Sequence, residues 1–136
     1  MYYVLVYDCR NYSAHLEERR MTVGEISQVN GRVPITILRL RERIDLDNFA
    51  ELENLVKAAY EAGTRNLVID LEQSNTLTSI GLRAFVVIHK IMAKDNNTNR
   101  LRVTGVTTMI HEIMEVTGIL EFIDIYDTVD EAVASF

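Results

Sequence analysis

Apolar positions in the first third of the chain come in short runs. Two such runs, at residues 26–29 and 35–40, flank Asn30-Gly31, and Asn-Gly between two apolar runs is the strongest short signal of a β-hairpin. Pro34 limits where the second strand can begin. This pattern predicts an antiparallel hairpin across the turn.

The pattern then changes to a helical period that ends at Gly63. Its apolar positions are Phe49, Leu52, Val56 and Ala59. Asn48, with Glu51 three residues later, has the form of a capping box, which favours a helix start at this point. We therefore predict a helix from Asn48 to about Gly63.

The remaining pattern predicts three further strands and three further helices. Short apolar runs, typical of buried strands, lie at residues 66–71, 101–106 and 122–126. Helical spacing is found at residues 79–94, 109–116 and 132–136. Gly118 is a preferred residue for ending the second of these helices, and Thr128 with Glu131 repeats the capping-box spacing before the third.

Strands that alternate with helices imply right-handed crossovers onto a largely parallel sheet. The hairpin at one edge makes the sheet mixed. We therefore predict an α/β fold, with an N-terminal hairpin followed by alternating strands and helices, about four helices in all.

Residues 1–20 differ from this pattern. Four of the six tyrosines lie there, namely Tyr2, Tyr3, Tyr7 and Tyr12. Tyr2 to Tyr7 favours a strand, so we predict an N-terminal extension, either an edge strand or a partly ordered arm, and a domain over residues 21–136. Met21 is also a candidate natural start. A free, Tyr-rich strand edge would favour pairing with a second copy of the chain, giving a homodimer.

The length and composition are those of one globular domain. With 136 residues, 48% of them hydrophobic and one of them proline, the chain can bury a core that needs no metal or disulfide for stability. The single cysteine, Cys9, excludes an intramolecular disulfide.

The net charge of −6 is concentrated at one end of the chain. Residues 111–136 contain seven acidic residues and no Lys or Arg, while the remainder is nearly neutral. A nucleic-acid partner is disfavoured, because binding to phosphates needs a clustered basic face. No apolar stretch approaches the roughly 20 residues that cross a bilayer, and the first residues lack the basic region of a signal peptide. We expect a soluble, cytoplasmic protein that does not bind membranes.

The residues suited to catalysis form no recognisable group. His15, His89 and His111 are isolated from each other and from metal-ligand spacing, so we expect solvated surface histidines. Cys9 has the surroundings of a plain thiol. The turn at residues 75–79 lacks the Lys of a nucleotide-binding loop. We predict no catalytic residues, no metal and no cofactor.

Hydroxyl side chains gather where the second predicted helix begins. They are Ser74, Thr76, Thr78 and Ser79. One of them can serve simply as a helix cap. Alternatively, one is displayed for covalent modification, since a phosphate of about −1.5 to −2 charges would sit favourably at the positive end of the helix dipole. The residues alone leave both interpretations open.

Read together, these segments resemble a known family. The strand at residues 67–70, followed by Leu-Glu-Gln-Ser-Asn-Thr-Leu-Thr-Ser-Ile-Gly-Leu at residues 71–82, resembles the signature of STAS domains, the family of bacterial anti-sigma factor antagonists. The C-terminal half is similar too, at residues 105–107, 114–119 and 122–132. The resemblance runs from about Gly24 to the end of the chain.

The resemblance implies a protein that binds an anti-sigma factor serine kinase of the GHKL type and so releases a sigma factor. Binding would end when the kinase phosphorylates a serine at the start of the helix. By position that acceptor is Ser79, and Gly81 would allow close approach to the helix start. The partner-binding residues expected on this basis are Asp45, Thr78, Ser79, Gly81 and Arg83.

The chain departs from the family pattern at four positions. Thr78 stands where the family has Asp, Ile80 replaces a second Ser, Glu42 replaces a common Gly and Thr108 replaces a frequent Pro. Thr78 is therefore a candidate second acceptor.

Two other functions remain compatible with the sequence. One is a non-catalytic scaffold or sensory subunit of a larger signalling complex, in which Thr78 and Ser79 are only caps. The other is a STAS module that binds a nucleotide or another small ligand.

Overall fold

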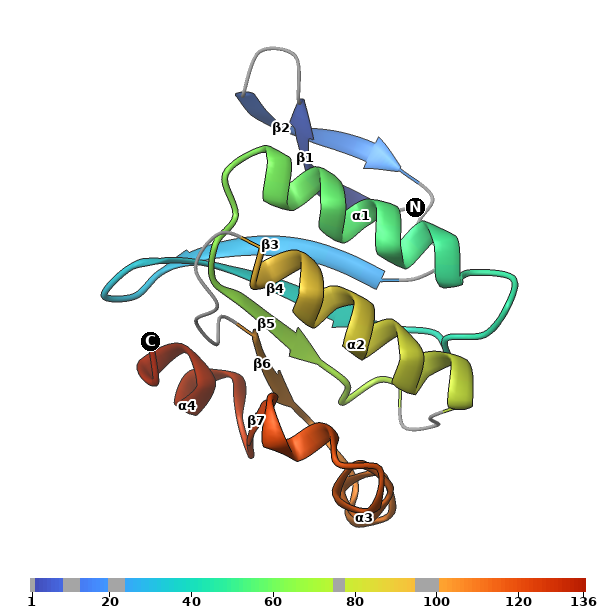
Figure 1. Ribbon diagram of the computed structural model, residues 1–136. Coiled ribbons are helices and arrows are strands. Elements are labelled where there is room, and N and C mark those ends of the chain that lie inside the picture. The colour runs from blue at the N-terminus through green and yellow to red at the C-terminus, as the bar shows by residue number, and fades with distance from the viewer. Residues whose placement is uncertain (1, 9–12, 20–23, 75–77, 95–100) are drawn as a thin grey trace.

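The computed structural model describes residues 2–8, 13–19, 24–74, 78–94 and 101–136, the first two ranges as backbone (Figure 1). The strands are β1 (Tyr2–Asp8), β2 (Ser13–Arg19), β3 (Gly24–Asn30), β4 (Pro34–Leu40), β5 (Leu67–Asp70), β6 (Leu101–Thr104) and β7 (Asp124–Tyr126). The helices are α1 (Phe49–Glu61), α2 (Ser79–Met92), α3 (Thr108–Val116) and α4 (Val129–Ala134), with a short 3-10 helix, η1 (Ile119–Glu121).

Five strands form one mixed sheet in the order β3-β4-β5-β6-β7. The β3–β4 pair is antiparallel, whereas the other three pairs are parallel. The parallel pairs are linked by α1, α2 and α3, as crossover connections require. The predicted α/β fold, with its hairpin at one edge of a mixed sheet, is confirmed.

Helices cover both faces of this sheet. α1 and α2 lie side by side on one face, and α4 lies on the other (Figure 1). β4 is therefore buried on both sides: Leu38 packs toward the α1 and α2 side, and Ile37 packs toward α4. Burial on both faces explains why this strand is almost continuously apolar instead of alternating with polar residues.

The apolar stripe of α2 fixes which face the helix turns to solvent. Phe85 and Ile88 are each 1% exposed and belong to the main core, while Ser79 and Arg83 are exposed. Burial of a side chain the size of Phe85 stabilises the fold by about 2 kcal/mol. The core thus sets the orientation of the helix start.

The N-terminal extension forms a hairpin of its own. β1 covers the predicted strand and pairs antiparallel with β2, which the sequence pattern did not reveal. The two strands make a separate two-stranded sheet close to β3, and not an edge strand of the larger one. The domain boundary at residue 21 and a homodimer through the extension stay predictions.

Two expectations about local structure were wrong. α1 begins at Phe49, but Asn48 makes no side-chain cap hydrogen bond, because its amide is bonded within the preceding loop instead. β7 is shorter than the predicted run at residues 122–126, because the chain leaves α3 through Gly118, in the left-handed conformation, and makes η1 before the strand.

Two glycines with positive φ provide a test of close packing near β5. Gly105 has φ +72°, and a Cβ placed there would lie 2.5 Å from the backbone N of Glu72, whereas Gly118 has φ +80° and open space around it. We expect Gly118→Ala to lower the free energy of unfolding by about 1 kcal/mol, the cost of a left-handed non-glycine residue. Gly105→Ala adds a clash with backbone and should cost about 3 kcal/mol. Urea unfolding of both variants measures this, and equal losses would contradict the packing described.

Candidate functional site

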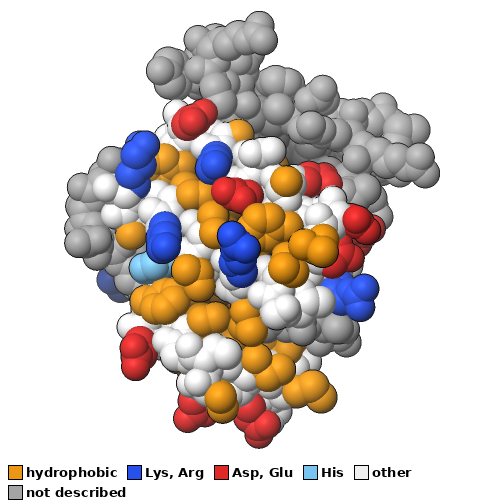
Figure 2. All heavy atoms as spheres, turned by 45° about the vertical axis from the view of Figure 1, so that its right-hand side comes forward, with side chains coloured by type: hydrophobic (Ala, Val, Ile, Leu, Met, Phe, Trp, Pro, Cys, Tyr) orange, Lys and Arg blue, Asp and Glu red, His pale blue; other side chains and the backbone are white. Residues whose placement is uncertain are grey.

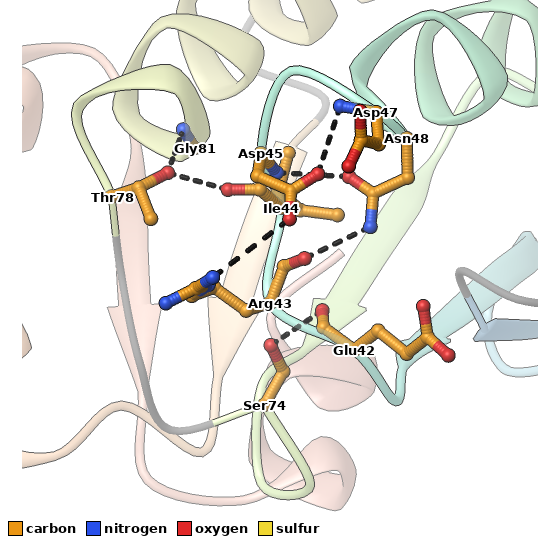
Figure 3. Close-up of polar contacts among 9 residues, drawn as sticks. All are labelled: Glu42, Arg43, Ile44, Asp45, Asp47, Asn48, Ser74, Thr78 and Gly81. Carbon is orange, nitrogen blue, oxygen red and sulfur yellow. Dashed lines mark hydrogen bonds and ion pairs between the residues drawn. The ribbon is translucent and has the colours of Figure 1, made fainter.

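Two hydroxyl groups near the start of α2 hold the loop that follows β4. Ser74 Oγ donates a hydrogen bond of 2.8 Å to the carbonyl oxygen of Glu42. Thr78 Oγ1 donates to the carbonyl oxygen of Ile44, two residues further along the same loop. Figure 3 shows both bonds crossing between the two segments. The loop after β4 and the start of α2 are therefore one unit, although 34 residues separate Ile44 from Thr78.

Thr78 is also the N-cap of α2. Its backbone is extended, and its Oγ1 accepts a hydrogen bond of 3.0 Å from the backbone N–H of Gly81. This satisfies one of the N–H groups that a helix start leaves without a partner. Of the hydroxyls for which the sequence left a capping role open, Thr78 is the one that caps the helix, and its single hydroxyl both donates and accepts.

The loop after β4 is stiffened from within by Asn48. Asn48 Oδ1 accepts from the backbone N–H of Asp45 at 2.9 Å, and its Nδ2 donates to the carbonyl oxygen of Arg43 at 2.9 Å. Asp45 in turn accepts from the N–H of Asp47 at 2.9 Å and lies 3.9 Å from the guanidinium of Arg43. Ile44, 5% exposed, anchors the loop in the core.

The predicted site residues differ in their solvent exposure. Gly81 is buried, Thr78 and Asp45 are half-buried, and Ser79 and Arg83 are exposed. Within the described part of the chain, the Ser79 hydroxyl has no hydrogen-bond partner. The structure thus places Ser79 at the surface, directly after the residue that holds the helix start in place.

The histidines give no second site among the described side chains. His89 is half-buried against Phe122, with ring centroids 4.8 Å apart, and this burial lowers its pKa. Phe122 thus covers part of the ring while part of it stays exposed, so the expectation of a solvated histidine holds only in part. His111 is exposed and borders an open hollow of about 260 Å³ between α3 and β7. His15 lies outside the described side chains.

Neither a metal centre nor a membrane span is found in the ranges that the structure describes. No three His, Cys, Asp or Glu side chains come close enough there to hold a metal ion. No helix in those ranges is both long and apolar enough to cross a bilayer.

Residues 27–132 match the profile of the STAS domain. The chain belongs to the STAS domain family. The family assignment covers β4, the loop after it, and all of α2, so the two segments joined by Ser74 and Thr78 both lie within the domain.

Similar proteins carry consistent names. The anti-sigma-B factor antagonist of Staphylococcus aureus is 29% identical over 82 residues, which are 60% of this chain and 74% of that protein. A putative anti-sigma factor antagonist from Thermotoga maritima has a solved structure that matches with a TM-score of 0.70 at 17% identity, over 82% of this chain and 92% of that one.

A second solved structure is that of the anti-sigma factor antagonist SpoIIAA in its unphosphorylated form. It matches with a TM-score of 0.63 at 10% identity, over 82% of this chain and 94% of that one. At such low identities these likenesses establish that the STAS fold is shared.

Sequence reasoning missed two residues that build this site. Ser74 belonged to the hydroxyl cluster, but its position gave no sign that it would bond to Glu42, 32 residues away. Asn48 was read as a helix cap, although it serves the loop before the helix. The partner of Ser74 is a backbone group that only the folded domain brings near, whereas the partners of Asn48 lie three and five residues before it in its own loop.

The contribution of the two Thr78 hydrogen bonds to stability can be measured by comparing substitutions at Thr78 and Ser79. Thr78→Ala removes a cap and leaves the Ile44 carbonyl without its partner, so we expect a loss of about 2 kcal/mol in the free energy of unfolding. Thr78→Ser keeps the hydroxyl and should lose less than about 1 kcal/mol. Ser79→Ala is the control and should change stability by less than about 0.5 kcal/mol, as at most exposed positions. Equal urea midpoints for Thr78→Ala and Ser79→Ala would contradict the assignment.

Proposed function

We propose that this STAS domain is an anti-sigma factor antagonist, a protein-binding module and not an enzyme, controlled by phosphorylation of Ser79. In its unmodified form it binds an anti-sigma factor serine kinase of the GHKL type, and the sigma factor held by that kinase is released. Phosphate on Ser79 ends the binding.

The observation that carries this proposal is the contrast between two adjacent hydroxyls. Thr78 uses its hydroxyl twice, as donor to Ile44 and as acceptor from Gly81. Ser79 is exposed, and its hydroxyl makes no hydrogen bond among the described residues. A kinase can therefore reach Ser79 without breaking the helix start, whereas modification of Thr78 would remove the cap. This favours Ser79 over Thr78 as the acceptor.

The names of similar proteins support the regulatory role. The Staphylococcus aureus relative is named an anti-sigma-B factor antagonist. The fold neighbour SpoIIAA is described in its unphosphorylated form, which accords with control by phosphate.

The position of Ser79 makes a phosphate tolerable to the fold and disruptive to a partner. Ser79 is the first residue of α2, where the partial positive charge of the helix end favours an anion. The fold should therefore survive modification. A partner in contact with the expected surface, formed by Ser79 with Asp45 and Arg83, would meet about −1.5 to −2 new charges.

Incubation of the chain with its cognate kinase and ATP tests the acceptor. We expect one phosphate per chain, which peptide mass spectrometry places on Ser79. Ser79→Ala should abolish the modification, and Thr78→Ser should keep it because the cap is retained. If neither Ser79 nor Thr78 carries phosphate while the kinase modifies a control substrate, the proposed switch is wrong.

A matched pair of variants tests the effect on binding. Ser79→Asp adds a negative charge at the helix start, and Ser79→Asn has nearly the same shape without the charge. Calorimetry with the kinase should give a Kd at least about tenfold higher for Ser79→Asp than for Ser79→Asn, because an uncompensated charge at an interface costs more than about 1.4 kcal/mol. Equal Kd values would show that charge at this position does not control binding.

A further inference from the structure

Arg83 lies one helical turn after Ser79 on the solvent side of α2. Both residues are exposed. Residues four apart on a helix are neighbours, and the order acid first, base second is the favourable one for an ion pair. A phosphate on Ser79 would therefore lie within reach of the Arg83 guanidinium.

Arg83 has no competing carboxylate among the described residues. α2 contains no Asp or Glu, and its exposed charged side chains, Arg83 and Lys90, are both cationic. No described acidic side chain comes within 4.0 Å of Arg83. Arg39, by contrast, is paired: its side chain lies 3.5 Å from the carboxylate of Asp70 in the sheet. As far as the described residues go, the guanidinium is thus available to an incoming anion.

The face of the molecule toward the start of α2 carries basic and hydrophobic side chains. Figure 2 shows the side of the molecule that carries the right-hand ends of α1 and α2 in Figure 1. Lys and Arg side chains stand among hydrophobic ones on that face, and most acidic side chains lie toward its margins.

We propose that Arg83 is the internal counter-ion for phosphoserine at position 79. The planar guanidinium can donate two N–H groups to two phosphate oxygens, a geometry that Lys cannot reproduce. This inference rests on Ser79 being the modified residue. It adds a second effect to the switch, because phosphorylation would both add an anion and occupy the one cation that stands a turn away from it.

Two other charges face the helix start from the loop after β4. Asp45 would repel a phosphate, and Arg43 would attract it, but Arg43 lies 3.9 Å from Asp45 and their charges largely cancel. Thr78 and the loop carbonyl it holds are neutral. Arg83 is therefore the cation that should dominate the field at Ser79, and Arg43 is the competitor that an experiment must exclude.

The test uses the full chain with phosphoserine incorporated at position 79 during translation, so that no kinase is needed. A ³¹P NMR titration gives the second pKa of the phosphate. We expect this pKa to be lower by about 0.3 pH unit with Arg83 present than in Arg83→Gln, the size of an i,i+4 ion pair. Lys90→Gln, which removes the same charge further along the helix, is the matched control and should leave the phosphate pKa unchanged.

Further variants define the interaction. Arg83→Lys should retain part of the shift, since the charge remains, and Arg43→Gln should change the phosphate pKa less than Arg83→Gln does. In concentrated urea the difference in phosphate pKa between the parent chain and Arg83→Gln should disappear, because the helix that brings the two groups together is lost.

The outcomes separate this inference from the proposed function. If Arg83→Gln and Lys90→Gln give the same phosphate pKa as the parent chain, or Arg43→Gln gives the larger change, Arg83 is not the counter-ion and the inference fails. If the kinase leaves Ser79 unmodified, the proposed function fails whatever the titration shows. Circular dichroism of each variant confirms that the helix is intact.

Discussion

Two hydroxyl-to-carbonyl hydrogen bonds, from Ser74 to Glu42 and from Thr78 to Ile44, determine where α2 begins. They tie the loop after β4 to the segment after β5, at the carboxyl ends of two adjacent parallel strands. Ligand and partner sites in open α/β sheets commonly lie at this edge. Without the two bonds, two part-buried carbonyl groups would lose their protein partners, at about 1 kcal/mol each. The surface proposed for partner binding thus rests on contacts that the fold itself requires.

The division of roles between Thr78 and Ser79 follows from that constraint. The hydroxyl of Thr78 donates one hydrogen bond and accepts another within the fold. The next residue, Ser79, faces solvent. A helix start tolerates a negative charge through its dipole, and under the proposal made above Arg83 would neutralise part of that charge one turn away. Charge can therefore change on the surface while the cap beneath it stays in place.

The sequence predicted the larger features of the fold because they arise from periodic burial. The Asn30-Gly31 hairpin and the apolar stripe of α2 both follow from local sequence patterns. A cap among the hydroxyls at the start of α2 was one of two interpretations that the sequence left open, since a hydroxyl before a helix is a local feature; the structure assigns it to Thr78. The bonds of Ser74 and Asn48 were not predicted, because their partners belong to a loop whose path depends on the whole sheet. β2 was missed because its sequence, Ser-Ala-His-Leu-Glu-Glu-Arg, has no strong strand pattern.

In the proposed switch, the start of α2 keeps its structure while the charge on its surface changes. Amide hydrogen exchange of the unmodified chain and of the chain phosphorylated at Ser79 tests this most directly. We expect the N–H groups of Gly81 and Asp45, bonded to Thr78 and Asn48, to keep their protection within about fivefold after modification, because a change below about 1 kcal/mol is expected when a cap survives. A loss of protection at both amides by a factor of about one hundred would show that phosphate melts the helix start and that the proposed switch is wrong.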